Sequence, residues 1–158
     1  MIHGAKKSFY ATQFVLPEKF WGQYWAKKYF DENIVAVRDR RVDLIRIFII
    51  DPLESPAQRQ VLDNLIKQHI DNQIPIRLIE TKEYLKSHNG SDEDLRDILI
   101  VDEQLSGILL LNKGGSFNKV EFSIDRTTVE KRKRNFERLL ASSVPYEEWV
   151  KSYNVRAQ

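Results

Sequence analysis

DLIRIFIID, residues 43–51, is the stretch of sequence that decides the fold. It is short and almost continuously apolar, and an aspartate stands at each end. A strand with one solvated face alternates apolar and polar side chains, whereas this stretch is apolar at nearly every position. It therefore predicts a strand inside a sheet that helices cover on both faces.

The segments that follow this strand predict a β-α-β unit. Residues 57–72 come after two prolines and have apolar side chains at helical spacings of three and four, namely Val61, Leu62, Leu65, Ile66 and Ile70. Residues 74–80 form a second apolar stretch of strand length. Two parallel strands joined by such a helix are expected to have a right-handed crossover.

The flanking segments predict further strands and helices. Residues 8–16 are rich in aromatic and β-branched side chains and indicate a strand, and residues 20–39 indicate a long helix despite Gly22. Residues 87–94 are polar and indicate an exposed connection, after which residues 97–102, 106–112 and 119–125 predict a three-stranded meander. Thr127 or Thr128 is expected to cap the last long helix.

The predicted fold class is α/β, with a mixed sheet of about five to seven strands flanked by helices on both faces. We expect one domain over residues 1–158, as 158 residues suit a single core. Its core spans residues 43–141, with an N-terminal strand and helix over residues 8–39 and a C-terminal tail over residues 144–158 that packs back as a short helix.

Composition narrows the class of protein. The chain has no cysteine, so disulfides, thiolate zinc sites and a cysteine nucleophile are excluded. The first ten residues have no apolar run typical of a secretory signal, and the longest apolar runs are far shorter than the ~20 residues of a membrane helix. We therefore expect a cytoplasmic protein with no membrane span.

Charge gives no strong indication of a nucleic-acid partner, because the formal net charge is only +2. The densest basic run is Lys131, Arg132, Lys133 and Arg134. This run is either a solvated helix face paired with Glu130 and Glu137, or a contact surface for nucleic acid.

Aromatic side chains gather near the start of the first long helix. Six large rings fall within eleven residues: Phe20, Trp21, Tyr24, Trp25, Tyr29 and Phe30. They either fill both flanks of a helix packed on the sheet, or Trp21, Tyr24 and Trp25 form a partner or dimer surface.

The histidines and carboxylates form no recognisable catalytic or metal-binding pattern. The histidines at positions 3, 69 and 88 are scattered, and we expect His69 to be a packed helix residue. The acidic residues near position 93 lack the spacing of a calcium loop, so they indicate a solvated loop. No cofactor or metal is expected.

From residue 44 to residue 140 the order of elements resembles one repeat of the phospholipase D superfamily. The segments that carry this resemblance are residues 45–51, 61–70, 76–80, 98–102, 108–111 and 135–139. In that family, a histidine and a lysine two residues later act on the phosphate, with an aspartate five residues beyond the lysine. If Asp102 matches that aspartate, the other two positions are occupied by Leu95 and Asp97, and neither can perform the chemistry.

The resemblance also suggests a pocket. Gly115, Ser116, Phe117 and Asn118, followed by Glu121, are similar to the family's Gly-Ser-x-Asn and acidic elements, although they come later after Asp102 than in the family pattern. They are either a remnant pocket or ordinary turn residues. Single-repeat members of the family join two active sites in a homodimer, which implies a homodimer here.

Two arginines stand in otherwise apolar predicted strands. Arg46 and Arg77 are expected to pair with Glu80, Asp102 or Glu121, or else to bind a phosphate or carboxylate ligand. Together these features predict a non-catalytic sensor, regulatory or protein-interaction module, and a further domain in a longer protein is an open alternative. The alternatives are a nuclease-like enzyme that uses carboxylates and a nucleic-acid-binding domain.

Overall fold

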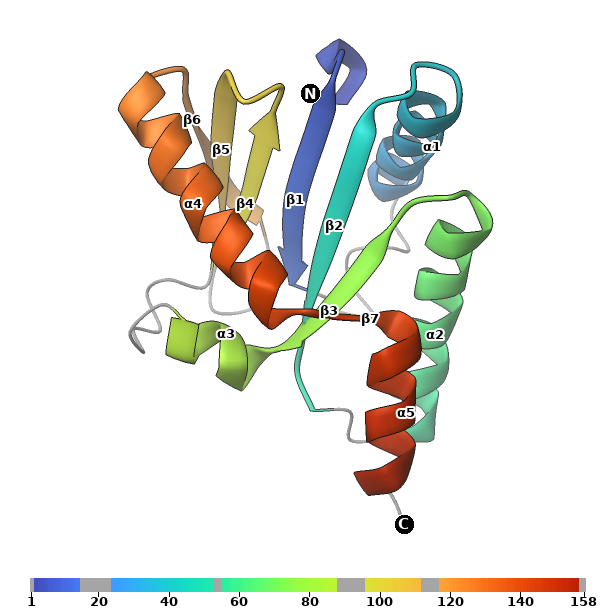
Figure 1. Cartoon of the computed structure of the whole chain (residues 1–158). Coiled ribbons are helices and arrows are strands. Elements are labelled where there is room, and N and C mark those ends of the chain that lie inside the picture. The colour runs from blue at the N-terminus through green and yellow to red at the C-terminus, as the bar shows by residue number, and fades with distance from the viewer. Residues whose placement is uncertain (1, 15–23, 53–54, 88–95, 112–116, 157–158) are drawn as a thin grey trace.

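A seven-stranded mixed sheet forms the centre of the computed structural model (Figure 1). The structure describes residues 2–14, 24–52, 55–87, 96–111 and 117–156. The strand order is β6-β5-β4-β1-β2-β3-β7. The strands are β1 Ser8–Phe14, β2 Asp43–Ile50, β3 Ile76–Glu80, β4 Arg96–Val101, β5 Leu105–Leu111, β6 Phe117–Ser123 and β7 Val144–Pro145.

The sheet has a parallel half and an antiparallel half. β1, β2 and β3 run parallel, whereas β4, β5 and β6 form an antiparallel meander that joins the parallel half through β1. β1 therefore lies in the middle of the sheet. It is hydrogen-bonded to β2 on one side and to β4 on the other.

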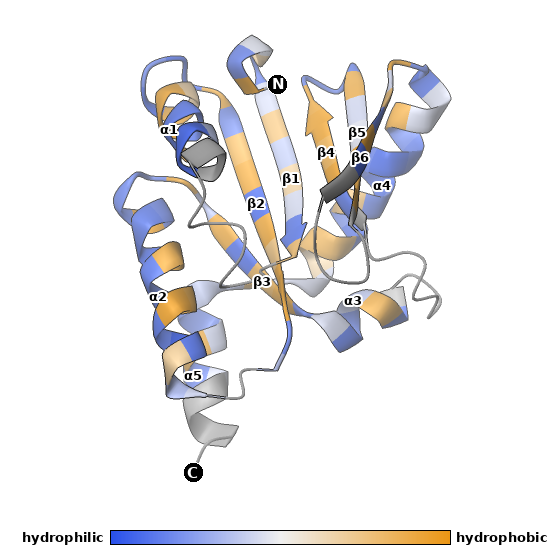
Figure 2. Ribbon diagram, turned by 180° about the vertical axis from the view of Figure 1, so that it is seen from behind, coloured by the Kyte–Doolittle hydropathy of each residue, from blue (hydrophilic) through white to orange (hydrophobic). Residues whose placement is uncertain are grey.

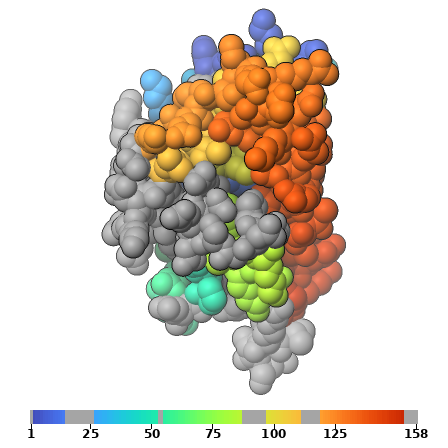
Figure 3. All heavy atoms as spheres, turned by 90° about the vertical axis from the view of Figure 1, so that its left-hand side faces the viewer, coloured from blue at the N-terminus to red at the C-terminus, as the bar shows by residue number. Residues whose placement is uncertain are grey.

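Helices cover both faces of the sheet (Figures 1 and 2). On one face lie α1 (Tyr24–Arg38), α2 (Pro56–Asp71) and α5 (Tyr146–Arg156), and on the other lie α3 (Thr81–Ser87) and α4 (Arg126–Ser142). Figure 3 views the side of the molecule on which α4 and β6 reach the surface. None of the described helices is long and apolar enough to cross a membrane.

β2 contributes to both apolar layers, as its sequence predicts. Leu44, Phe48 and Ile50 pack with the α1, α2 and α5 side chains, and Ile47 and Ile49 pack with α3 and α4. All five side chains are at most 2% exposed. The alternation along a strand sends neighbouring side chains to opposite faces, so a strand covered twice must be apolar at nearly every position.

Local chemistry fixes where two of the helices begin. Ser55 caps α2 by accepting the Gln58 N–H at 3.2 Å, and Pro56 occupies the first turn. Asp125 caps α4 by accepting the Thr128 N–H at 2.8 Å. The prediction that Thr127 or Thr128 caps α4 is therefore wrong, since Thr128 supplies the donor and the carboxylate of Asp125 is the acceptor.

Three short elements were not anticipated from the sequence: α3, β7 and the 3₁₀ turn η1 (Ile2–Gly4). Tyr84 is the one fully buried side chain among the described residues of α3, and a single buried position gives too little periodicity to predict a helix. β7 is two residues long and pairs with β3 at the edge. The predicted connection at residues 87–94 falls almost wholly outside the described residues.

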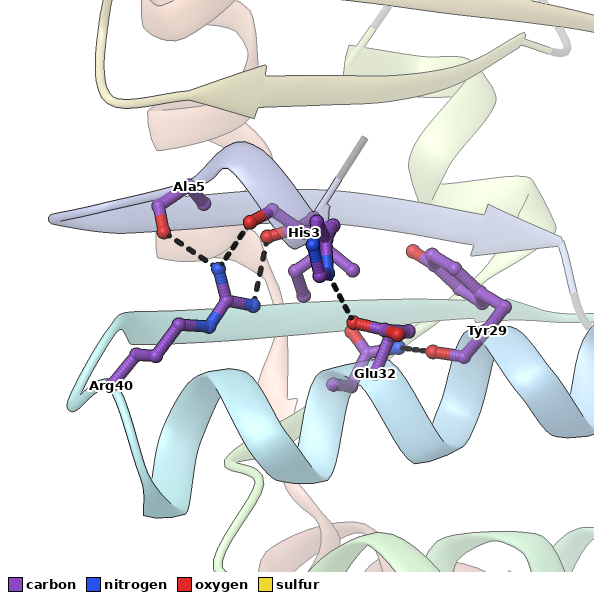
Figure 4. Close-up of polar contacts among 7 residues, drawn as sticks. His3, Ala5, Tyr29, Glu32 and Arg40 are labelled. Atoms are coloured by element: carbon purple, nitrogen blue, oxygen red, sulfur yellow. Dashed lines mark hydrogen bonds and ion pairs between the residues drawn. The ribbon is translucent and has the colours of Figure 1, made fainter.

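Arg40 anchors the N-terminal turn to the end of α1 (Figure 4). Its Nη1 donates to the carbonyl oxygens of His3 at 2.6 Å and Ala5 at 3.0 Å, and its Nη2 donates to Ile2 at 3.0 Å. The His3 ring also lies 3.1 Å from the Glu32 carboxylate. A planar fork with several donors can satisfy three carbonyls at once, which a single ammonium group cannot do in the same geometry.

We predict that Arg40→Lys lowers the free energy of unfolding by about 1–2 kcal/mol, because it removes hydrogen bonds from a charged donor to three carbonyls. Urea denaturation measures this loss. Arg38→Lys is the matched control, since Arg38 is 71% exposed and bonds only its neighbour Asp39 among the described contacts. Equal stability of the two variants would show that the Arg40 fork is not needed.

Candidate functional site

A buried polar cluster lies between the sheet and helices α1 and α2. Its centre is Arg46 of β2, which has 0% exposed surface. Arg46 shares its sheet face with Leu44 and Phe48, so its guanidinium enters the apolar layer beneath the two helices. Burying a charge in such a layer is costly unless polar groups surround it.

Four side chains from three elements contact the guanidinium. Nη2 donates to the Tyr29 hydroxyl at 3.0 Å and to Asn33 Oδ1 at 2.9 Å, both on α1. Nη1 lies 3.4 Å from Gln13 Oε1 of β1 and 3.4 Å from His69 Nε2 of α2. The guanidinium carbon is also 5.1 Å from the centre of the Tyr29 ring. Arg46 therefore ties β2 to β1, α1 and α2.

His69 serves the cluster as a neutral acceptor. Its Nδ1 lies 2.8 Å from the Leu65 carbonyl oxygen, which places the ring proton on Nδ1 and leaves the Nε2 lone pair toward Arg46. Burial, together with the nearby Arg46 charge, lowers the pKa of His69 to about 3, although the hydrogen bond with the Leu65 carbonyl acts to raise it. The rings of Phe30 and Phe48 enclose the imidazole at 4.6 and 5.3 Å.

Asp97 is a buried carboxyl group whose pKa is affected by the Arg46 charge. It lies at the start of β4, is 7% exposed and accepts the Phe14 N–H at 2.8 Å. Burial raises the pKa of Asp97 to about 7, although the Phe14 N–H, the Arg46 charge and the Thr12 hydroxyl all act to lower it. Its ionisation therefore falls near neutral pH.

Asp102 lies at the opposite end of β4 and bonds the chain just before β1. Its carboxylate accepts the N–H groups of Lys6, Lys7 and Ser8 at 2.7–3.2 Å, while its own N–H donates to the Ser8 carbonyl at 2.9 Å. Burial acts to raise the pKa of Asp102, but the three backbone donors outweigh it and lower the pKa. Asp102 also adopts a positive φ of 51°, a conformation that aspartate tolerates.

Asp97 and Asp102 are too far apart to hold one metal ion. They are five positions apart in the chain, which at a rise of ~3.3 Å per residue places their backbones ~16 Å apart. Each carboxylate also accepts backbone N–H groups. Within the described ranges, no three histidine, cysteine or acidic side chains are grouped in a way that could hold a metal ion.

The structure separates the side chains for which an anion or ligand contact was predicted. Arg46 lies under α1 and α2, whereas Arg77 of β3 donates to the Ser143 hydroxyl at 2.9 Å and to its carbonyl at the end of α4. Glu121 is on β6, paired with Lys119 at 2.9 Å. Ser116 and the side chain of Asn118 lie outside the described residues.

The predicted aromatic interface is described only in part. Trp21 lies outside the described residues, as do the side chains of Tyr24 and Trp25, whose backbone begins α1. The two later rings of that run pack inward: Tyr29 contacts Arg46, and Phe30 contacts His69.

The basic run of α4 divides between two sides of the helix. Arg132 donates to the Ser106 hydroxyl and carbonyl, and Lys133 pairs with Glu103 at 2.6 Å and lies 3.7 Å from Glu137. Lys131 and Arg134 are exposed. With Arg138, which is also exposed, they form a stripe at spacings of three and four residues. The run is therefore not one continuous basic surface.

The sequence identified Arg46 but not the neutral groups around it. The signal for them was present as interruptions of apolar faces: Asn33 has 0% exposure on α1, His69 has 0% exposure on α2, and Gln13 is 6% exposed in β1. Polar side chains at positions that should be apolar indicate a buried network. Which of them meet depends on how the helices lie on the sheet.

The two buried titratable groups give opposite contributions to stability with pH. His69 has a native pKa of about 3, below its ordinary 6.5, so between these pH values the unfolded chain binds a proton that the native protein does not bind. His69 therefore lowers the free energy of unfolding as the pH falls below 6.5. Asp97 has a native pKa of about 7, above its ordinary 3.8, so between these pH values the native protein binds a proton that the unfolded chain does not bind. The stability that this proton gives is lost as the pH rises toward 7.

We predict that the loss of stability caused by Asp97→Asn is largest at acidic pH. Between pH 4 and 7, the free energy of unfolding of the unsubstituted protein should exceed that of Asp97→Asn by about 1.4 kcal/mol more for each unit that the pH falls. The reason is that only the native protein with Asp97 gains a proton in this range. Urea denaturation at several pH values measures this. Asp71→Asn, an exposed change of the same kind on α2, is the control. Parallel profiles for Asp97→Asn and the unsubstituted protein would contradict the shift.

Comparison with known proteins places the chain in a family. The model of a domain of unknown function, DUF6879, matches residues 25–151. Among solved structures, TrmBL2, an archaeal chromatin protein described as showing a novel mode of DNA binding, is similar at a TM-score of 0.55 and 14% identity, over 91% of this chain and 46% of that one. This likeness concerns the fold, and the chain spans less than half of that protein. No curated protein matches the chain. The chain belongs to the DUF6879 family.

Proposed function

We propose that this domain is a non-catalytic sensor, regulatory or protein-interaction module of phospholipase D-like type. One observation carries the proposal: the two acidic side chains that fall on the family's lysine and aspartate positions are both bonded to backbone N–H groups. Asp97 accepts from Phe14, and Asp102 accepts from Lys6, Lys7 and Ser8. Carboxylates in this role hold strands together, and their hydrogen-bonding capacity is used by the backbone.

The buried histidine of α2 supports the same proposal. His69 has 0% exposed surface, its Nδ1 bonds Leu65, and its Nε2 faces Arg46. A nucleophile or general base must be reached by the substrate and must accept a proton near neutral pH. A ring that is enclosed, with a pKa of about 3, meets neither requirement.

The proposal predicts no phosphodiester hydrolysis. Purified protein incubated with bis(p-nitrophenyl) phosphate, and with a single-stranded oligonucleotide, should release product at the rate of buffer in the presence of Mg²⁺ or Mn²⁺ and in EDTA. Asp97→Asn and Asp102→Asn should behave identically to the unsubstituted chain. Metal-dependent cleavage that either substitution abolishes would instead establish the alternative, a carboxylate-using nuclease.

Nucleic-acid binding is a second proposal, favoured by two observations. Lys131, Arg134 and Arg138 form an exposed stripe on α4, and the DNA-binding archaeal protein offers a precedent on a similar fold. The geometry supports this proposal less well than the first, because Arg132 and Lys133 of the same run contact Ser106 and Glu103. Three phosphate contacts give only weak binding at physiological salt.

If this stripe binds DNA, the affinity should fall steeply with salt, and Lys131→Glu should weaken it at every sequence and lower the salt slope by about 1. Fluorescence anisotropy with a labelled duplex at two salt concentrations measures both effects. Lys67→Glu on α2 is the control, since Lys67 is exposed and lies on a different helix. Absent or salt-independent binding would rule out this role for α4.

A further inference from the structure

β6 is the last strand at one edge of the sheet. Its backbone pairs with β5 from Ser106 opposite Ser123 to Leu111 opposite Phe117. Among the strands that the structure describes, none lies on its other side. The outward backbone N–H and C=O groups of an edge strand are a template for pairing with another strand.

The side chains of β6 alternate between the two faces of this edge. Ser106 receives the Arg132 hydrogen bonds from α4, so Ser106, Ile108 and Leu110 of β5 have side chains on the α4 face. Their partners on β6 include Glu121 and Lys119, which share that face. The Lys119 and Glu121 side chains remain 59% and 47% exposed although they pair with each other at 2.9 Å.

We propose that β6 pairs antiparallel with β6 of a second copy of this chain, about a two-fold axis at Val120. In this register Lys119 lies opposite Glu121 of the second copy, and Glu121 lies opposite Lys119 of the second copy. The same contact thus forms twice, as an isologous interface requires. The two sheets become one continuous sheet, and this inference goes beyond the proposed function.

The charges select this register over its neighbours. A two-fold axis at Lys119 or at Glu121 would place two identical charges directly opposite each other, which destabilises a strand pair. Charged side chains often protect an edge strand from pairing. Here the positive and negative charges on either side of Val120 are complementary to a second copy of themselves, so they permit one register and oppose the others.

The opposite face of the edge offers apolar surface to the same contact. Phe122 is 50% exposed and lies over Gly107 of β5, where an added Cβ would be 3.1 Å from its ring. Ile124, directly after the strand, is 81% exposed. These two side chains are the most exposed large hydrophobic residues among those described. A paired β6 would lay a second strand beside Phe122 and Val120.

Charge reversal at the two positions tests the pairing. Sedimentation velocity of the full chain over a range of concentrations should show a dimer. Lys119→Glu and Glu121→Lys should each weaken it by at least about tenfold, since both cross-strand pairs become repulsive. The double variant K119E/E121K should restore the dimer with its charges exchanged. An equimolar mixture of the two single variants should form a heterodimer.

The control separates the register from a general effect of charge. Lys67→Glu makes the same charge change on α2 and should leave the dimer intact. Unfolding midpoints confirm that each variant is folded. A monomer at all concentrations, a dimer that both single variants retain, or a double variant that fails to recover overturns the proposal. A dimer insensitive to positions 119 and 121 would place the contact elsewhere, for example at Trp21, Tyr24 and Trp25. None of these outcomes bears on phosphodiester hydrolysis.

Discussion

The guanidinium of Arg46 has no exposed surface, and the layer of the structure beneath α1 and α2 is arranged around it. A charge in such a layer must be surrounded by polar groups, and three neighbouring elements supply them: Gln13 from β1, Tyr29 and Asn33 from α1, and His69 from α2. This requirement fixes the rotation of both helices against the sheet. It also explains why His69 is a neutral acceptor, since a protonated ring there would face a second positive charge.

A second constraint acts where the parallel half of the sheet meets the antiparallel half. β4 is the strand that joins them, and a carboxylate secures β1 near each of its ends: Asp97 bonds the Phe14 N–H, and Asp102 bonds the N–H groups before and at the start of β1. Asp97 and Asp102 therefore both have a structural role at this junction. Because burial brings the pKa of Asp97 near neutrality, the strength of one of these connections depends on pH.

The features that remain for interaction with other molecules are at the surface. The edge of β6 has self-complementary charges and exposed apolar side chains, and α4 has an exposed basic stripe next to acidic residues. Figure 3 views the side of the molecule on which these two elements reach the surface.

The fold class could be predicted from the sequence, because strand and helix periodicity are local and strong in residues 43–80, where the apolar pattern of β2 fits a strand covered on both faces. The sequence did not determine α3 or β7, which are too short to carry a period, nor the acceptor at the start of α4, where Asp125 and two threonines compete. The site could not be predicted in this way. Arg46, Asn33 and His69 lie on three different elements, and their contact follows from how α1 and α2 lie on the sheet, whereas the exposed edge of β6 follows from strand order. Local sequence encodes neither of these arrangements.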